Sequence, residues 1–353
     1  MVGTLAARPL RRSLAQIQYV CAVPPGAAHG LVAAVYTQLE RDFGMLAPPV
    51  ALHSPAPGPL AACWLMLRET LVAAGRADRA AKEAVAAATS LANTCPYCIS
   101  VHAATLDGLV TGDAAAAIAA DRIESVAEPA LRSIAAWARR TGRPGQAEAA
   151  SRPFPADQRA ELIGVAVTFQ YLNRMVNVFL GESPLPDAVP ARAGQVMMRL
   201  LGRLTRSAGR RAAGSRPSFE LLPAAPLPPD MTWAQGSERV AGAFGRAVQA
   251  IEEAGVSAVP EAVRALVLAE LTRWDGHPRG PSRAWAQDAV RGLALADQPA
   301  GRLALLTAFA SYQVTSSDID ELRRHKLGDE ALIALTSWSS LAAARTVGTW
   351  LAD

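Results

Sequence analysis

The chain has 353 residues, of which 51% are hydrophobic and 5% aromatic, and its net charge is +4. Seven arginines and one glutamate between positions 191 and 220 supply this positive charge, so a basic segment explains it better than a nucleic-acid-binding surface. No apolar stretch of 18 or more residues lacks charge and turn residues, and the N-terminal arginines precede no signal-peptide core. We therefore expect a cytoplasmic protein without a membrane contact.

Helix-forming residues dominate the chain, and strand-forming residues are not grouped into alternating runs, so we expect an all-α protein. A helical lead-in over 1–45 is followed by five prolines between 47 and 60, which predict a loop. After that loop, helical spacing predicts helices over 64–72, 79–91, 95–108, 124–140 and 156–180.

The composition changes between 186 and 230, where the basic stretch is followed by several prolines. We expect two helical halves, 1–185 and 231–353, joined by this linker. Residues 161–172 align with 330–341 without a gap, and the alanine-rich helix that ends at Cys98 aligns with 304–319. These matches predict that the second half repeats the first and has lost both thiols.

The most informative segment holds two cysteines and a histidine. Cys95, Cys98 and His102 are spaced three and four residues apart, so on the helix expected from position 95 they share one face. Thr94 is the expected N-cap, and Pro96 is tolerated in the first turn. The positive end of the helix dipole stabilises thiolates there, and His102 can exchange a proton with Cys98. The segment therefore predicts redox chemistry.

Glu83 precedes Cys95 by twelve residues, which on an unbroken helix places it roughly 120° away from the cysteine face. Because Asn93 and Thr94 interrupt the helix, Glu83 can instead approach the cysteines from a helix packed alongside. Taken alone, Glu83 could also be an ordinary solvated carboxylate. We include it in the expected site with Cys95, Cys98 and His102.

Zinc is the main alternative to redox chemistry for a close cysteine pair. A structural zinc site needs four ligands, and a catalytic site needs three ligands and a water molecule. The chain has four cysteines, and Cys21 and Cys63 stand apart among apolar residues, where we expect both to be buried. We therefore expect no metal and no cofactor. His53 falls near a loop and is expected at the surface.

The pattern Glu-x11-Cys-x2-Cys-x3-His, here Glu83, Cys95, Cys98 and His102, resembles the motif of the alkyl hydroperoxidase D (AhpD-like) family in the carboxymuconolactone decarboxylase superfamily. The resemblance covers roughly 45–180, and the second half looks like the companion half of some members. It implies an AhpD-like helical bundle, a trimer-based homo-oligomer and an antioxidant peroxidase. Tyr97 stands where some peroxidase members have a histidine.

The resemblance also implies a role for each residue. Cys98 attacks the hydroperoxide, Cys95 resolves the sulfenic acid to a disulfide, and Glu83 and His102 relay protons. From the residues alone the order of the thiols is open, because the helix dipole favours a thiolate at Cys95 and His102 favours one at Cys98. The implied partners are a hydroperoxide and a thiol or dithiol electron donor, either a protein or a small molecule.

Three other functions are alternatives to peroxidase activity. The decarboxylases of the superfamily generally do not depend on a CxxC pair, so the pair argues against decarboxylation. A thiol-disulfide oxidoreductase or electron-transfer adaptor without a peroxide substrate remains open, as does a non-catalytic, stress-related scaffold. The grouping of Glu83, Cys98 and His102 favours an enzyme over a scaffold but does not separate a peroxidase from an oxidoreductase.

Overall fold

The computed structural model describes residues 14–145, 152–185, 193–194, 196–198, 202 and 216–352, and these form helices and loops without a β-strand. The expected all-α class is confirmed. The first half contains α2 (Gly30–Asp42), α3 (Pro48–Ala51), α4 (Pro57–Leu67), the π-helical turn η3 (Arg68–Val72), α5 (Arg79–Ala92), α6 (Pro96–Asp107), α7 (Ala114–Ala119), α8 (Pro129–Arg140) and α9 (Arg159–Phe179). The second half contains α11 (Glu238–Ala258), α12 (Glu261–Thr272), α13 (Ala284–Ala289), α14 (Gln298–Ala310), α15 (Ser316–Arg324) and α16 (Asp329–Trp350).

The long helices α5, α6 and α9 lie within a few residues of their predicted bounds. The segment 47–60, expected as a loop, instead contains α3 and the start of α4. Pro48 and Pro57 each open one of these helices, where the missing N–H removes no helical hydrogen bond. The helix expected near 124–140 begins later, at Pro129, because Glu128 caps it by accepting two backbone N–H groups.

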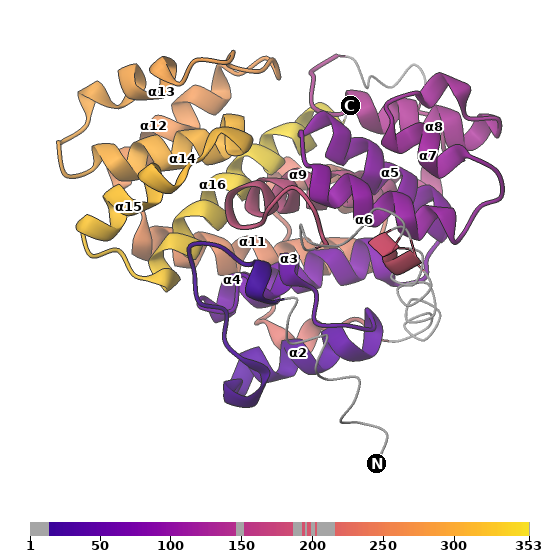
Figure 1. Cartoon of the computed structure of the whole chain (residues 1–353), viewed down its shortest axis with the longest axis horizontal. Coiled ribbons are helices and arrows are strands. Elements are labelled where there is room, and N and C mark those ends of the chain that lie inside the picture. Colours follow the sequence, from indigo (N-terminus) through magenta and orange to yellow (C-terminus); the bar gives the residue numbers. More distant parts are fainter. Residues whose placement is uncertain are drawn as a thin grey trace.

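One continuous apolar core runs through both halves of the molecule. Almost every residue of α9 is buried, and this helix packs against α5 on one side and α16 on the other. Figure 1 shows α9, α11 and α16 in the middle, with α5 to α8 on one side and α12 to α15 on the other. No helix in the described ranges is both long enough and apolar enough to cross a bilayer.

The predicted linker lies largely outside the described residues, including all of its arginines except Arg216. From residue 216 onward the chain runs beside the first half, where the turn η7 (Phe219–Leu221) contacts α2, α4 and α11. In each half an alanine-rich helix is followed by a shorter one, and a long buried helix later packs back on the first: α5, α6 and α9, with α7 and α8 inserted before α9, then α14, α15 and α16. That the halves are separate domains and related copies remains a prediction.

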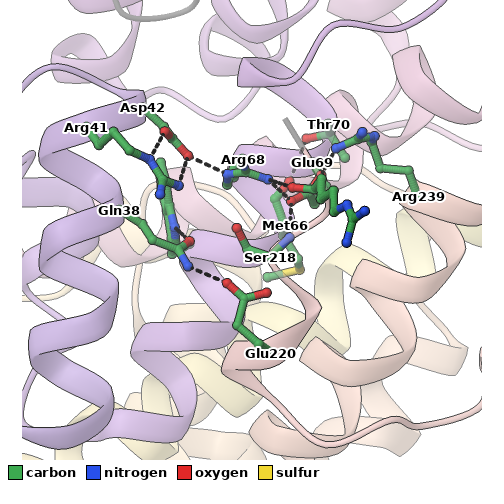
Figure 2. A network of polar contacts seen from close by, with 12 residues as sticks. Gln38, Arg41, Asp42, Met66, Arg68, Glu69, Thr70, Ser218, Glu220 and Arg239 are labelled. Atoms are coloured by element: carbon green, nitrogen blue, oxygen red, sulfur yellow. Dashed lines mark hydrogen bonds and ion pairs between the residues drawn. The ribbon is translucent and has the colours of Figure 1, made fainter. Parts of the chain in front are cut away.

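A buried charge network, formed by Asp42, Arg68, Glu69 and Arg239, joins α2, η3 and α11 (Figure 2). Arg68 donates from Nε to Asp42 Oδ2 at 2.7 Å and from Nη1 to Glu69. Glu69 also accepts from the Ser218 backbone N–H at 3.0 Å and from Arg239 Nη1 at 2.5 Å. Asp42, Arg68 and Glu69 are at most 2% exposed, so each charge depends on its partners in place of water.

Removing the charge of Glu69 is expected to destabilise the fold. Glu69→Gln leaves Arg68 and Arg239 without the carboxylate that they share, and breaking a buried ion pair costs about 3–5 kcal/mol. Urea unfolding measures the change. The matched control is Arg41→Ala, because Arg41 pairs with Asp42 from the network's solvent-exposed edge and should contribute about 1 kcal/mol or less. Equal losses in the two variants would contradict this account.

Candidate active site

The dithiol lies where α5 ends and α6 begins. Thr94 has a φ of 51°, in the left-handed region, and its N–H donates to the Leu91 carbonyl at 3.2 Å. The Cys95 N–H donates to the Ser90 carbonyl at 3.0 Å. This pair of bonds is the Schellman arrangement that closes a helix, with threonine in the position that glycine usually occupies. Cys95, and not Thr94 as expected, is the N-cap of α6, and no side chain caps that helix.

Both cysteines of the pair are free thiols and fully buried, at 0% exposure for Cys95 and 2% for Cys98. Burial raises the pKa of Cys98 well above its ordinary value, and the hydrogen bond with Cys95 raises it further, while a hydrogen bond with Asn173 lowers it. This direction is opposite to the thiolate at Cys98 that His102 was expected to favour. Cys98 therefore rests as a neutral thiol at neutral pH and needs a base to react.

Glu83 and His102 meet across the interface between α5 and α6. His102 Nδ1 lies 2.7 Å from Glu83 Oε2, and Glu83 Oε1 accepts from Arg79 Nε at 2.7 Å. Burial alone would raise the pKa of Glu83, but the nearby charges of Arg79 and His102 outweigh it and hold this pKa below its ordinary value. The carboxylate is thus charged, and it orients the imidazole ring, which also packs edge-on against Phe169 at 4.5 Å.

A cavity of about 50 Å³ is lined in part by Cys98 and His102. A cavity needs roughly 10–15 Å³ to hold one water molecule, so this one admits a few waters or a slim molecule. The rest of its wall is mostly apolar and comes from the connection after α2, from α3, the end of α4, α6 and α9: Phe43, Met45, Ala47, Pro48, Pro49, Val50, Leu67, Tyr97, Val101 and Leu172.

Cys98 and His102 face the same cavity, although no hydrogen bond joins them directly in the described structure. His102 Nδ1 is occupied by Glu83, and no described residue bonds to the other ring nitrogen, Nε2. Nε2 can therefore exchange a proton with a molecule in the cavity or with the thiol. The arrangement provides a neutral thiol, an oriented imidazole and an apolar approach for a substrate.

Three residues that sequence reasoning did not find complete the site. Arg79 lies four residues before Glu83, a spacing at which opposite charges pair on a helix, so it could have been found. Asn173 bonds through Nδ2 to Ser90 Oγ at 3.0 Å and also contacts the Cys98 thiol. The only signal for Asn173 was a polar side chain among the apolar residues of a predicted helix. Phe169 gave no signal at all.

Two expectations outside the motif were wrong. Cys21 is exposed, with its N–H donating to Asp329 Oδ2 at 2.8 Å, while Cys63 is buried as expected. His53 is completely buried, and burial lowers its pKa to about 4, so its ring is neutral beside the Tyr171 hydroxyl at 2.8 Å. Among the described residues, no group of three or more His, Cys, Asp or Glu side chains could hold a metal ion.

Residues 59–140 match the sequence profile of the carboxymuconolactone decarboxylase family. This range runs from α4 to α8 and includes Glu83, Cys95, Cys98 and His102. A protein of Mycobacterium tuberculosis named alkyl hydroperoxide reductase is 36% identical to the chain over 337 residues, which covers 95% of each sequence. The similarity thus extends through the second half, beyond the range of the family profile.

The four thiols should differ sharply in their reaction with iodoacetamide at pH 7. Cys21 is exposed and should react first, whereas burial raises the pKa values of Cys63 and Cys98 and keeps both thiols protonated. Mass spectrometry of the reduced native protein should show one rapid modification, and of the unfolded protein four. Cys21→Ser should abolish the rapid step. A rapid modification that persists in Cys21→Ser would contradict the burial of the other three thiols.

Proposed function

The chain belongs to the carboxymuconolactone decarboxylase family, and we propose that within it this protein is a thiol-dependent peroxidase that reduces hydroperoxides. The observation that carries the proposal is the mostly apolar cavity whose lining includes a buried thiol and an oriented imidazole, Cys98 and His102. The relative from Mycobacterium tuberculosis, which is named an alkyl hydroperoxide reductase, supports a peroxide-reducing enzyme.

In the first step, His102 Nε2 takes the proton of the Cys98 thiol, directly or through a water in the cavity. The thiolate attacks the terminal oxygen of the hydroperoxide, the O–O bond breaks, and the leaving alkoxide takes a proton from His102. The products are an alcohol and a sulfenic acid on Cys98. Glu83 stabilises the transient imidazolium because its charge sits 2.7 Å from Nδ1.

In the second step, Cys95 attacks the sulfur of the Cys98 sulfenic acid. An S–S bond forms, the S–O bond breaks, and hydroxide leaves as water with the proton of Cys95. The two thiols have then lost two electrons to the peroxide. The influence of Cys95 on the pKa of Cys98 supports this step, because it requires the two thiols to be neighbours. A thiol or dithiol donor restores the pair by thiol–disulfide exchange and is itself oxidised.

The lining of the cavity favours an organic hydroperoxide over hydrogen peroxide. Its wall is dominated by side chains such as Phe43, Val50 and Leu172, which gain from contact with an alkyl chain but cannot hydrogen-bond a small polar molecule. The peroxide group would then be the polar end, held against Cys98 and His102. A cytoplasmic location and a trimer-based homo-oligomer remain predictions of the family resemblance.

Burial of the thiols favours a peroxidase over a general thiol-disulfide oxidoreductase. Exchange with a protein disulfide requires the attacking sulfur to align with a bulky partner, and Cys95 and Cys98 are at most 2% exposed. A slim hydroperoxide can reach Cys98 through the cavity without opening the helices. The described geometry therefore suits a small oxidant better than a protein substrate.

The order of the two cysteines can be tested with one equivalent of a slim, unbranched alkyl hydroperoxide that the cavity can admit. We expect the reduced protein to lose two titratable thiols, and Cys95→Ser to accumulate a sulfenic acid on Cys98 that dimedone traps. Cys98→Ser should leave Cys95 unoxidised. Mass spectrometry of the trapped peptides reads the outcome. Sulfenic acid on Cys95 would reverse the assigned roles, and rapid turnover of disulfides without peroxide consumption would support the oxidoreductase.

The proton relay predicts both a rate loss and a change in pH dependence. Glu83→Gln and His102→Gln should slow oxidation of Cys98 at pH 7 by at least about tenfold, since general acid–base help is worth roughly 10²–10⁴-fold. The pKa of Cys98 is raised, so without the relay only its small thiolate fraction reacts. The remaining rate should rise about tenfold per pH unit from pH 6 to 9, whereas that of the wild type should rise less steeply because its relay does not depend on the thiolate fraction alone.

Stopped-flow measurements in a Cys21→Ser background give these profiles without interference from the exposed thiol. Ser100→Ala is the matched control, because Ser100 is exposed on α6 and lies outside the cavity. Thermal unfolding of each variant separates loss of the relay from loss of the fold. Wild-type rates and pH profiles in both folded relay variants would remove Glu83 and His102 from the mechanism.

A further inference from the structure

A second pocket, of about 110 Å³, lies at the turn between α5 and α6 and shares no lining residue with the thiol cavity. Its walls come from both halves. The first half contributes this turn, the end of α8 and the middle of α9, and the second half contributes the segment after α12 and the end of α14 with the residues that follow it. Three arginines line it, Arg139, Arg143 and Arg174, and no aspartate or glutamate does. The pocket is therefore strongly positive at neutral pH.

Arg174 is the central charge of this pocket. It is 6% exposed, and its hydrogen bonds to described residues go to uncharged oxygens: Nε to the Ala308 carbonyl at 2.9 Å, and Nη1 to Gln170 Oε1 at 2.8 Å and to the Gln170 carbonyl. Burial lowers the pKa of Arg174 to about 10, so it remains charged at neutral pH. No acidic side chain within the described ranges pairs with it, and a buried charge without a counter-ion is costly.

Gln170 adds an unsatisfied donor at the same place. Its side chain is completely buried, and the Nε2 amide has no hydrogen-bond partner in the described structure. This amide lies beside Gly142, another lining residue, since a Cβ atom built on Gly142 would be 3.9 Å from it. Buried N–H donors are almost always paired, so this one lacks an acceptor.

The two remaining arginines differ in their partners. Arg139 already forms a bidentate pair with Asp121, with both N–O distances at 3.0 Å. Arg143 is exposed and forms no ion pair with any residue that the structure describes. Arg143 and Arg174 are thus the two charges that an incoming anion can neutralise, and Gln170 Nε2 is the donor that it can satisfy.

We propose that this pocket binds a small oxyanion, a carboxylate or a phosphate, through Arg143, Arg174 and Gln170. Such a group supplies what the pocket lacks, a negative charge and a hydrogen-bond acceptor, and guanidinium groups bind both kinds of oxyanion with charge-assisted hydrogen bonds. The aromatic rings of Trp274 and Phe309 also line the pocket and can contact the apolar body of a ligand that carries the anion.

Hydrogen bonds also join the pocket to Asn173, the residue that lowers the pKa of the Cys98 thiol. Asn93, which lines the pocket, donates from Nδ2 to Asn173 Oδ1 at 3.0 Å. Asn177 donates to the Asn93 carbonyl at 3.1 Å and to Ser311 Oγ of the second half at 3.0 Å. A bound anion would therefore sit at the junction of the two halves, directly beside the turn that carries Cys95.

Calorimetric titration of the full chain with inorganic phosphate, acetate and benzoate, in chloride buffer at pH 7, tests the proposal. We expect saturable binding of at least one anion at a single site, weakened by added salt because the attraction is electrostatic. Preference for phosphate identifies a phosphate ligand, and tighter binding of benzoate than of acetate identifies a carboxylate on an apolar body. Absence of binding for all three up to about 10 mM would overturn the proposal.

Two variants place the anion in this pocket. Arg143→Ala should weaken binding roughly tenfold, the effect of losing about 1.4 kcal/mol. Arg140→Ala, also exposed but outside the pocket, should not. Gln170→Glu keeps the shape of the side chain and supplies Arg174 with a carboxylate, so it should abolish binding and raise the melting temperature. Unchanged affinity in Arg143→Ala would overturn the assignment whether or not Gln170→Glu folds, and retained binding in Gln170→Glu would do the same.

Discussion

The bond between Glu83 and His102 is the interaction on which the geometry of the thiol site depends. It crosses from α5 to α6, and it is possible only because the Schellman turn at Thr94 folds α6 back against α5. Arg79 holds the other oxygen of Glu83, so the carboxylate keeps its charge although no water reaches it. Glu83 on α5 therefore sets the orientation of the His102 ring on α6. The positions of Cys95 and Cys98 relative to this ring are then fixed by their places at the start of α6.

The sequence could predict those features of this site that depend on residues close together in the chain. Spacing along one helix placed Cys95, Cys98 and His102 together, and the break near Thr94 allowed Glu83 to join them. The burial of Glu83 and the raised pKa of Cys98 could not be predicted, because both depend on α9 and on the connection between α2 and α3, which are distant in sequence. The break at Asn93 and Thr94 was predicted, but its Schellman geometry was not, because threonine occupies the position where glycine usually marks such a turn.

Helix α9 contributes residues to both pockets described above. Phe169, Leu172 and Asn173 follow helical spacing: Phe169 packs on His102, Leu172 lines the thiol cavity, and Asn173 influences the pKa of Cys98. Gln170 and Arg174, four residues apart, face the positively charged pocket instead. Periodicity predicted the helix but not its two functional faces, because nearly all of its residues are buried and the polar ones do not form a solvent-facing stripe. Only the packing of α5 and α16 against it separates the faces.

The buried charge network around Glu69 has a consequence for how this sequence can change over generations. Glu69 is neutralised jointly by Arg68 from the first half and Arg239 from the second, with the Ser218 N–H between them. A lineage that shed residues 231–353 would remove one of these cations and expose the face of α4 that packs on α11. Loss of the second half would therefore destabilise the first half, so selection has a reason to keep the second half although it carries no thiol.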